Sequence, residues 1–415
     1  MLATRIREVT ALAAGTDLSL ATRRLMDLCD EFPVFHDLRG AAMALRADYN
    51  MGRELGAAEM SGASGSALAE RCRQLAAAIG QRSTGTAEVG HAPAAEVVFQ
   101  AQQLTKAFRS GGHHFQLGPI DLELRTGRIV GVVGENGNGK TTLLRQIAGL
   151  LDHDGGTLAH PHAGTDPYRI RQTIAWIPQR SVRWQGTLLQ NLRFQAAVHG
   201  TLGAANEDRV LYTLHRLGLT RFKDLTWKQL SSGYKLRFEL AKMLMWRPKV
   251  LVLDEPIANL DLQAQQLFLQ DLKHLAASQR DPVAVILSSQ QLHEIEAVAD
   301  DIIFLKNGKA AYSGAADSFD RDRNSNVFEL RGVFQRAQLE QALGAGAILH
   351  IDDTGLIFRL TTPRTVGPQQ VLKAIANADL EVSSVTSAPA RANSSTKIHE
   401  AAAQIDTRLP AAVGP

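Results

Sequence analysis

The stretch that decides the fold reads Ile129-Val-Gly-Val-Val133-Gly134-Glu-Asn-Gly-Asn-Gly139-Lys140-Thr141-Thr142. Its first five residues form a continuous apolar run, which predicts a strand buried on both faces of a parallel sheet. The glycines let backbone N–H groups turn around a phosphate, and the helical run 142–150 adds the positive potential of a helix N-terminus. This order predicts a phosphate-binding loop in which Lys140 holds the β- and γ-phosphates and Thr141 ligates magnesium.

A second buried strand is predicted to carry carboxylates at its end. The run Val250–Leu253 is apolar throughout, and Asp254 and Glu255 follow it. Because ligands of a doubly wound sheet bind at the carboxyl ends of the strands, both carboxylates are expected beside the phosphate loop. Asp254 is predicted to hold magnesium through water, and Glu255 to polarise an attacking water. Taken alone, Asp-Glu-Pro could also end a strand in a solvated turn.

Three further motifs, together with the phosphate loop and the strand that ends in Asp254 and Glu255, follow one another in the order typical of a known family. Ile177-Pro-Gln179 resembles the Q-loop, Leu230-Ser-Ser-Gly-Tyr234 the signature motif, Val250–Glu255 the Walker B motif and Ala258-Asn-Leu-Asp261 the D-loop of ATP-binding cassette (ABC) ATPases. The resemblance covers about residues 96–320. Within this family, the chain most resembles the ATP-binding subunits of exporter-type ABC transporters.

The resemblance implies a set of residues that contact ATP and Mg²⁺. Phe108 stands where the family has an aromatic side chain that stacks on adenine. The implied nucleotide-binding residues are Phe108, Asn136, Gly137, Gly139, Lys140, Thr141, Thr142, Ser231, Gly233 and Asp261. The implied magnesium ligands are Thr141, Gln179 and Asp254, and the implied catalytic residues are Glu255, Gln290 and Gln179. In the family, two subunits bind two ATP molecules head to tail, each between the phosphate loop of one subunit and the signature motif of the other.

Two motifs depart from the family pattern. Ser232 and Tyr234 replace Gly and Gln of the usual signature motif, and serine keeps the backbone N–H that a phosphate would need. Gln290 stands where the family has a histidine that contacts the γ-phosphate. An amide donates a hydrogen bond but carries no charge, so slow hydrolysis is expected with ATP binding preserved. His293, three residues further on, is expected to cap a helix or lie at the surface.

The apolar patterning predicts an α/β domain, with a small all-α domain before it and a ferredoxin-like α+β domain after it. The resemblance implies that the α/β part is a P-loop ABC ATPase domain with a helical subdomain. Thr16 or Asp17 is expected to cap one N-terminal helix, and Ser66 another that ends at Gly80. The predicted segments are a helical domain at 1–80, a linker at 81–95, the cassette at 96–320, the accessory domain at 326–386 and a tail at 387–415, with one short helix near 395–405.

Composition narrows the class of protein. The chain has 415 residues, of which 45% are hydrophobic and 21% charged, so it is able to bury cores in two to three domains. Its net charge of +3 is too small to indicate nucleic-acid binding, and basic residues do not form a stripe with aromatic ones. The two cysteines favour a reducing compartment. The sequence shows neither a membrane-spanning run nor a signal peptide, so a cytoplasmic chain is expected. The resemblance implies that it binds at the cytoplasmic face of the membrane.

Three functions stay open at the level of sequence. The first is an ATP-hydrolysing subunit that drives a separate polytopic transmembrane subunit of an exporter, paired with a second copy of itself or a homologous ATPase. The second is a soluble ABC ATPase unconnected to transport, although the single phosphate loop and the short spacing between Lys140 and Asp254 disfavour its DNA and ribosome classes. The third, suggested by Gln290, is a slow ATP-binding regulatory subunit.

Overall fold

The computed structural model describes residues 2–15, 17–55, 63–82, 95–110, 113–321, 325–353, 357–363, 365–378 and 380–388. The chain divides into two compact units, Met1–Ala315 and Ala316–Pro415. Most of the predicted linker and nearly all of the predicted tail, including its short helix, lie outside the described residues. The division of the first unit into a helical domain and a cassette therefore stays a prediction.

A six-stranded sheet in the order β5-β6-β7-β3-β8-β9 forms the centre of the first unit. Strands β5, β6, β7, β3 and β8 run parallel, and β9 is antiparallel to β8. The three central strands β6, β7 and β3 are buried along their whole length, which explains their continuous apolar sequences. The strands are β3 (Ile129–Val133), β5 (Ile174–Ile177), β6 (Val250–Leu253), β7 (Ala284–Ser289), β8 (Asp301–Lys306) and β9 (Lys309–Ala315). The predicted α/β class is confirmed.

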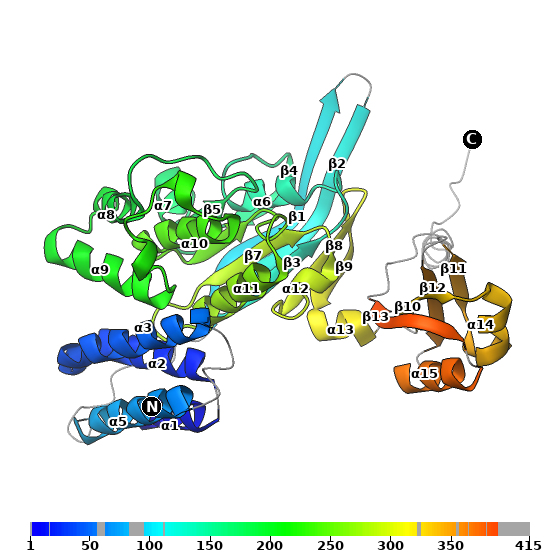
Figure 1. Ribbon diagram of the computed structural model, residues 1–415. Coiled ribbons are helices and arrows are strands. Elements are labelled where there is room, and N and C mark those ends of the chain that lie inside the picture. The colour runs from blue at the N-terminus through cyan, green and yellow to red at the C-terminus, as the bar shows by residue number, and fades with distance from the viewer. Residues whose placement is uncertain are drawn as a thin grey trace, which may run out of the picture. The chain divides into compact units, whose positions relative to one another are not determined.

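A second, antiparallel sheet in the order β2-β1-β4 packs against the first through a shared hydrophobic cluster. Its strands are β1 (Val97–Ser110), β2 (His113–Arg125) and β4 (Gly155–Ala159). Figure 1 shows β1 and β2, in cyan, as a long hairpin that extends past the helices. Both strands are longer than the predicted runs 97–101 and 115–124, because their outer halves pair only with each other and lack the apolar pattern of a buried strand.

Helices cover the six-stranded sheet, and three of them form a helical subdomain between the Q-loop and β6. Figure 1 shows this subdomain in green, with α8, α9 and α10 side by side. The helices of this region are α6 (Lys140–Ile147), α7 (Pro167–Thr173), α8 (Leu188–Val198), α9 (Gly203–Arg216), α10 (Ser232–Met243), α11 (Leu262–Ala276) and α12 (Leu292–Ile295), with the short 3-10 turns η3 (Thr220–Phe222), η4 (Trp227–Gln229) and η5 (Leu244–Trp246).

The N-terminal segment is helical, as predicted. It consists of α1 (Leu2–Ala14), α2 (Leu18–Glu31), η1 (Pro33–Leu38), α3 (Arg39–Leu55) and α5 (Ala63–Arg82). Asp17 caps α2 by accepting a hydrogen bond from the backbone N–H of Leu20 at 2.9 Å. The predicted limits of the last helix are wrong, because α5 includes both Ser66 and Gly80. Its buried stripe continues through Ile79 into the N-terminal hydrophobic cluster, and this packing outweighs the poor helix propensity of glycine.

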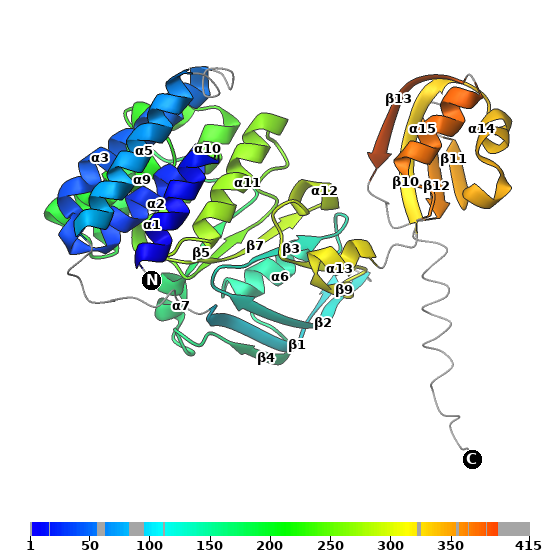
Figure 2. The same cartoon turned by 90° about the horizontal axis from the view of Figure 1, so that it is seen from below.

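The N-terminal helices form one compact unit with the cassette. Figures 1 and 2 show α2 and α3 next to α9 and α11. The apolar side chains of the N-terminal helices, from Val9 to Ile79, pack mainly on each other, and Tyr212 of α9 packs against this cluster. The attachment to the cassette is largely polar: Asn50 donates to the carbonyl of His215 at 3.0 Å, and Arg24 donates to the carbonyl of Ala277 at 2.9 Å.

The second unit contains a four-stranded antiparallel sheet in the order β11-β12-β10-β13, with helices after its first and third strands. This order is that of the predicted ferredoxin-like arrangement. Its elements are α13 (Ala316–Arg321), β10 (Ser325–Val333), α14 (Arg336–Leu343), η6 (Ala345–Ala347), β11 (His350–Asp353), β12 (Phe358–Pro363), α15 (Pro368–Asn377) and β13 (Glu381–Ala388).

Among the helices in the described parts of both units, none combines the length and apolar character that crossing a bilayer requires.

One histidine at the N-terminal interface predicts a loss of stability on acidification. Burial lowers the pKa of His274 on α11 to about 2, and the positive charge of the adjacent Arg23 is the next largest cause. Asp271 acts in the opposite direction and raises the pKa, whereas Arg46 and Arg216 lower it further. The pKa of an unfolded histidine is about 6.5. Unfolding therefore takes up a proton, so stability is complete above pH 6.5 and decreases as the pH falls toward 2. Between pH 6.5 and 5, His274 is expected to cost the first unit about 2 kcal/mol.

This prediction is checked by urea unfolding of the wild type and His274→Gln at pH 7 and pH 5. The glutamine variant should lose less free energy of unfolding over this interval, by about 2 kcal/mol. His36→Gln, at an exposed position, is the matched control and should behave as wild type. Equal pH dependence in wild type and His274→Gln would contradict the assignment.

Candidate functional site

The phosphate loop lies between β3 and α6 and has the geometry that its glycines require. Gly137 and Gly139 have φ angles of +81° and +95°, a region that other residues rarely adopt. A Cβ on Gly139 would also lie 2.7 Å from the Leu117 side chain. Lys140, the first residue of α6, is buried, and its Nζ donates to the carbonyl of Gly134 at 2.7 Å. The lysine therefore spans the loop from inside.

The two carboxylates after β6 lie at the same edge of the sheet. Thr141 donates through Oγ1 to the two Asp254 oxygens at 2.9 and 3.1 Å, so the end of β6 touches the first turn of α6. Ser288 at the end of β7 donates to Asp254 Oδ1 at 2.9 Å and accepts from the Glu255 N–H at 2.8 Å. Ser288 is not among the site residues that the motifs predict. Its position directly after the apolar run 283–287, at the carboxyl edge of the sheet, is the signal that could have found it.

Three donors converge on the carboxylate of Glu255. Lys140 Nζ lies 3.1 Å from Oε1, while Gln179 Nε2 and Gln290 Nε2 donate to Oε2 at 2.9 and 2.8 Å. Glu255 is 8% exposed and has a φ of +43°, a backbone conformation that costs a non-glycine residue about 1–3 kcal/mol. Such strain persists only where surrounding contacts hold it, and the three donors provide those contacts. The sequence placed Gln290 at a phosphate but did not predict its bond to Glu255.

The signature and D-loop residues form a second group. Ser231 caps α10 by accepting from the Tyr234 N–H at 3.4 Å, and Asp261 caps α11 by accepting from the Ala264 N–H at 2.8 Å. A Cβ on Gly233 would lie 3.0 Å from the Cβ of Ala264, so the first turns of the two helices touch. Within the described residues, the polar contacts of Ser231 and Asp261 are with their own helices rather than with the phosphate loop.

The remaining predicted nucleotide-binding residues surround the phosphate loop. Phe108 on β1 is 40% exposed and lies opposite Phe115 of β2, with ring centroids 6.4 Å apart. Phe115 in turn borders Gly139, since a Cβ there would lie 3.0 Å from its ring. Asn136 is exposed in the loop, and Thr142 is half-buried in the first turn of α6. The hairpin therefore places an accessible aromatic ring beside the loop.

Comparisons with known proteins match the part of the chain that carries this site. A family model described as ABC transporter matches residues 117–258, which include the phosphate loop, Gln179 and Glu255. The daunorubicin/doxorubicin resistance ATP-binding protein DrrA of Streptomyces peucetius is 30% identical over 254 residues, which span 59% of this chain and 76% of DrrA. The chain belongs to the family of ABC transporter ATP-binding proteins. It binds ATP and is an ATPase.

Two further comparisons cover the same part of the chain. The phosphonates import ATP-binding protein PhnC of Escherichia coli (strain K12) is 25% identical over 253 residues, which span 56% of this chain and 95% of PhnC. The solved structure of cbiO1 from Clostridium perfringens, described as part of the ABC transporter complex cbiONQ, matches with a TM-score of 0.50. It is 24% identical and covers 55% of this chain and 92% of cbiO1, and this likeness shows the fold.

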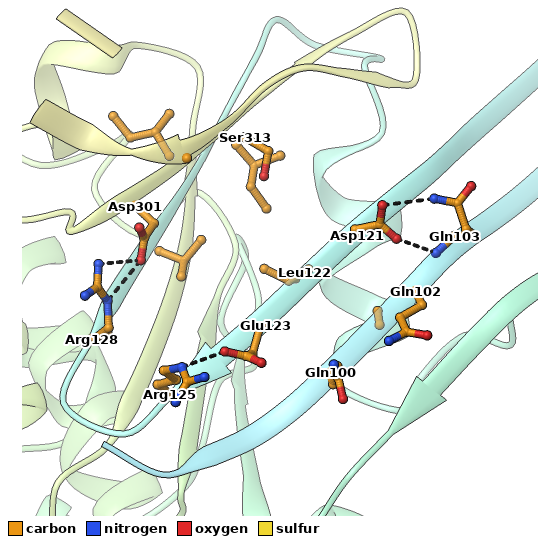
Figure 3. Close-up of a pocket in the computed structure, with 15 residues that line it drawn as sticks. Gln100, Gln102, Gln103, Asp121, Leu122, Glu123, Arg125, Arg128, Asp301 and Ser313 are labelled. Carbon is orange, nitrogen blue, oxygen red and sulfur yellow. Dashed lines mark hydrogen bonds and ion pairs between the residues drawn. The ribbon is translucent and has the colours of Figure 1, made fainter. Parts of the chain in front are cut away.

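A pocket of about 780 Å³ in this ABC ATPase lies between the β1–β2 hairpin and the β8–β9 edge. It contains none of the predicted site residues. Figure 3 shows that its charged side chains are already paired: Arg128 with Asp301 at 2.8 Å and Arg125 with Glu123 at 2.5 Å. Asp121 accepts two hydrogen bonds from Gln103. The chemistry therefore belongs to the phosphate loop rather than to this pocket.

Proposed function

We propose that this chain is the ATP-hydrolysing subunit of a membrane exporter, in which it works as a head-to-tail dimer around two ATP molecules with Mg²⁺. The observation that carries the proposal is the convergence of Lys140, Gln179 and Gln290 on Glu255, next to the bonded pair Thr141 and Asp254. A buried carboxylate with this set of donors at a phosphate loop suits the hydrolysis of a triphosphate.

The oxygen atoms of three residues suit a hard cation. The Thr141 hydroxyl and the Asp254 carboxylate are in contact, and the Gln179 amide bonds Glu255, the residue after Asp254, so these residues would hold Mg²⁺. The ion would neutralise charge that develops on the phosphates. Ser288 keeps the Asp254 carboxylate in place by donating to Oδ1.

Lys140 and Glu255 have complementary tasks in hydrolysis. When the phosphates occupy the loop, the Lys140 ammonium bonds them, and Glu255 Oε1 becomes available to accept a proton from the attacking water. Gln290 and Gln179 hold Oε2, so the carboxylate keeps its orientation during this exchange. In this scheme Gln290 orients the general base Glu255 through a hydrogen bond. That task needs a donor but no charge, so glutamine is able to replace the histidine that the family has at this position.

The second group of residues supports the dimer. Ser231, Gly233 and Asp261 lie at the adjoining N-termini of α10 and α11, where backbone N–H groups favour an anion. Their described polar contacts do not include the phosphate loop of the same chain. A second copy, or a homologous subunit, would bring its own nucleotide to this group, as the family resemblance implies.

An apolar surface after the Q-loop supports a polytopic partner at the cytoplasmic face of the membrane. Phe194 and Val198 lie one turn apart on α8 and are 68% and 60% exposed, and Leu202, just beyond the helix, is 68% exposed. Val182, three residues after Gln179, is 79% exposed. Phe194 and Val198, which we name the α8 surface, are suited to receive an apolar segment of the transmembrane subunit, and Val182 and Leu202 add exposed apolar side chains before and after α8 in the chain. The ferredoxin-like unit resembles accessory domains of exporter-type ATPases and supports the direction of export.

The change Phe194→Asp tests the link to a membrane subunit. A charge at the α8 surface should lower the amount of chain that co-purifies with a polytopic protein from detergent-solubilised membranes by about ten-fold or more. The ATPase activity of the isolated chain should stay unchanged, because Phe194 is exposed and far along the sequence from the phosphate loop. Met51→Asp, at an exposed position of α3, is the control. Turnover by a wild-type chain that associates with no polytopic protein would instead favour the soluble ABC ATPase.

A further inference from the structure

A buried cluster of charges joins the N-terminal helices to the helices of the signature motif and the D-loop. Asp271 on α11 is 1% exposed and accepts from Arg237 Nε of α10 at 3.0 Å. Its other oxygen accepts from Arg23 on α2, a residue that lies 248 positions earlier in the chain. Arg23 and Arg237 are 2% and 3% exposed. One carboxylate therefore ties three helices together, and we name Arg23, Asp271 and Arg237 the brace.

The brace depends on the single negative charge of Asp271. Arg46 on α3 is also buried and adds positive charge near Asp271, while its Nη1 donates to the Ser19 carbonyl at 3.1 Å. Burial raises the pKa of the Asp271 carboxyl, but Arg237, Arg23 and Arg46 outweigh it and keep the pKa below the usual range. The carboxylate thus stays ionised between cations that would otherwise repel each other.

A second contact fixes α9 of the same subdomain. Asp27 on α2 accepts from Arg216, and the Tyr212 hydroxyl donates to it at 2.5 Å. The N-terminal helices therefore hold α9, α10 and α11 through directional bonds, whereas their apolar side chains pack mainly among themselves. Ion pairs and hydrogen bonds fix the position and rotation of a helix more closely than a sliding apolar contact does.

The brace lies close to the ends of the helices that matter for the dimer. Arg237 follows Ser231 by six positions and Asp271 follows Asp261 by ten, which correspond to about 9 and 15 Å along straight helices. The first turns of α10 and α11 touch at Gly233 and Ala264. A shift of either helix at the brace is therefore carried to Ser231 and Asp261.

We propose that the N-terminal helices are a positioning element for ATP hydrolysis: through the brace they hold the signature helix and the D-loop helix in the arrangement that binds the nucleotide of the second subunit. This inference rests on the proposed dimer. Arg23 and Asp271 act through α10 and α11 and contact no nucleotide. The phosphate loop, Thr141 and Asp254 lie outside the brace, so ATP binding by a single chain does not depend on it.

The test uses the full chain with Arg23→Gln, the conservative Arg23→Lys, and Arg71→Gln as a matched control. Arg71 pairs with Asp48 at 2.7 Å on the exposed side of the N-terminal helices, away from the brace. Arg23→Gln should lower kcat about ten-fold, leave the ATP affinity of the Glu255→Gln chain within about two-fold of its reference, and speed amide hydrogen exchange in α10 and α11. Arg23→Lys should recover part of kcat, and Arg71→Gln should match wild type.

Unchanged hydrogen exchange in Arg23→Gln would overturn the inference, and so would either of two other results. One is faster exchange in α10 and α11 with unchanged kcat, which would make the brace a structural attachment only. The other is an ATP affinity that falls in parallel with kcat, which would indicate general destabilisation. The variant Asp271→Asn, which removes the central charge, must likewise lower kcat without lowering ATP affinity. A wild-type chain without turnover would contradict the proposed function instead, and unchanged exchange in Arg23→Gln would then still reject the brace.

Discussion

Replacement of Glu255 by glutamine is expected to lower ATP turnover by about 10²–10⁴-fold while ATP still binds. The amide has nearly the shape of the carboxylate but cannot accept the proton of the attacking water. Lys140, which bonds the phosphates in the proposed mechanism, and Thr141, which would hold Mg²⁺, are unchanged. The variant should therefore retain ATP, and the mass of the chain in solution should double when ATP is added. Steady-state phosphate release and light scattering measure the two effects.

The control for this prediction is Glu135→Gln in the phosphate loop. Glu135 is exposed, and it is its backbone carbonyl that accepts from Lys140, at 3.2 Å. The same chemical change at this neighbouring position should leave turnover near that of the wild type. Wild-type turnover in Glu255→Gln would remove Glu255 from the mechanism. A chain that stays monomeric with ATP would reject the dimer but leave the role of Glu255 standing.

The centre of the fold could be predicted because it follows from local sequence. Strands β3, β6 and β7 are buried on both faces, so each reads as an unbroken apolar run. The ends of these strands then place Lys140, Asp254 and Glu255 at one edge of the sheet. The limits of α5 could not be predicted in this way, since Gly80 indicates a helix end by its local propensity, whereas tertiary packing keeps the helix intact through it.

The side-chain partners were less accessible to sequence analysis. The bond of Gln290 to Glu255 joins residues 35 positions apart, and nothing in either motif specifies it. The partner of Arg23 is even harder to predict from sequence, because arginines on an amphipathic helix usually indicate a solvated face. This arginine is instead buried against Asp271. Only the position of α2 against α11 reveals the pair. Motifs thus locate the chemistry, while the contacts that hold it in place depend on long-range packing.

Removal of the Lys140 ammonium is expected to have the largest effect on nucleotide binding. Lys140→Met should weaken ATP affinity about 100-fold, about 3 kcal/mol, because the charge at the centre of the loop is lost. Turnover should fall at least in proportion. Equilibrium titration with a fluorescent ATP analogue measures the affinity. Unchanged affinity would show that the loop amides alone hold the phosphates.

The same substitution also leaves Glu255 buried with amide donors only. Breaking a buried ion pair from one side costs about 3–5 kcal/mol, so Lys140→Met should lower the free energy of unfolding of the first unit. The double variant Lys140→Met/Glu255→Gln removes the uncompensated charge and should regain most of that stability, yet bind ATP as weakly as Lys140→Met. Urea unfolding of both variants and the wild type separates the two roles of the lysine. Equal stability of the single and double variants would show that the ion pair between Lys140 and Glu255 does not hold the site together before ATP binds.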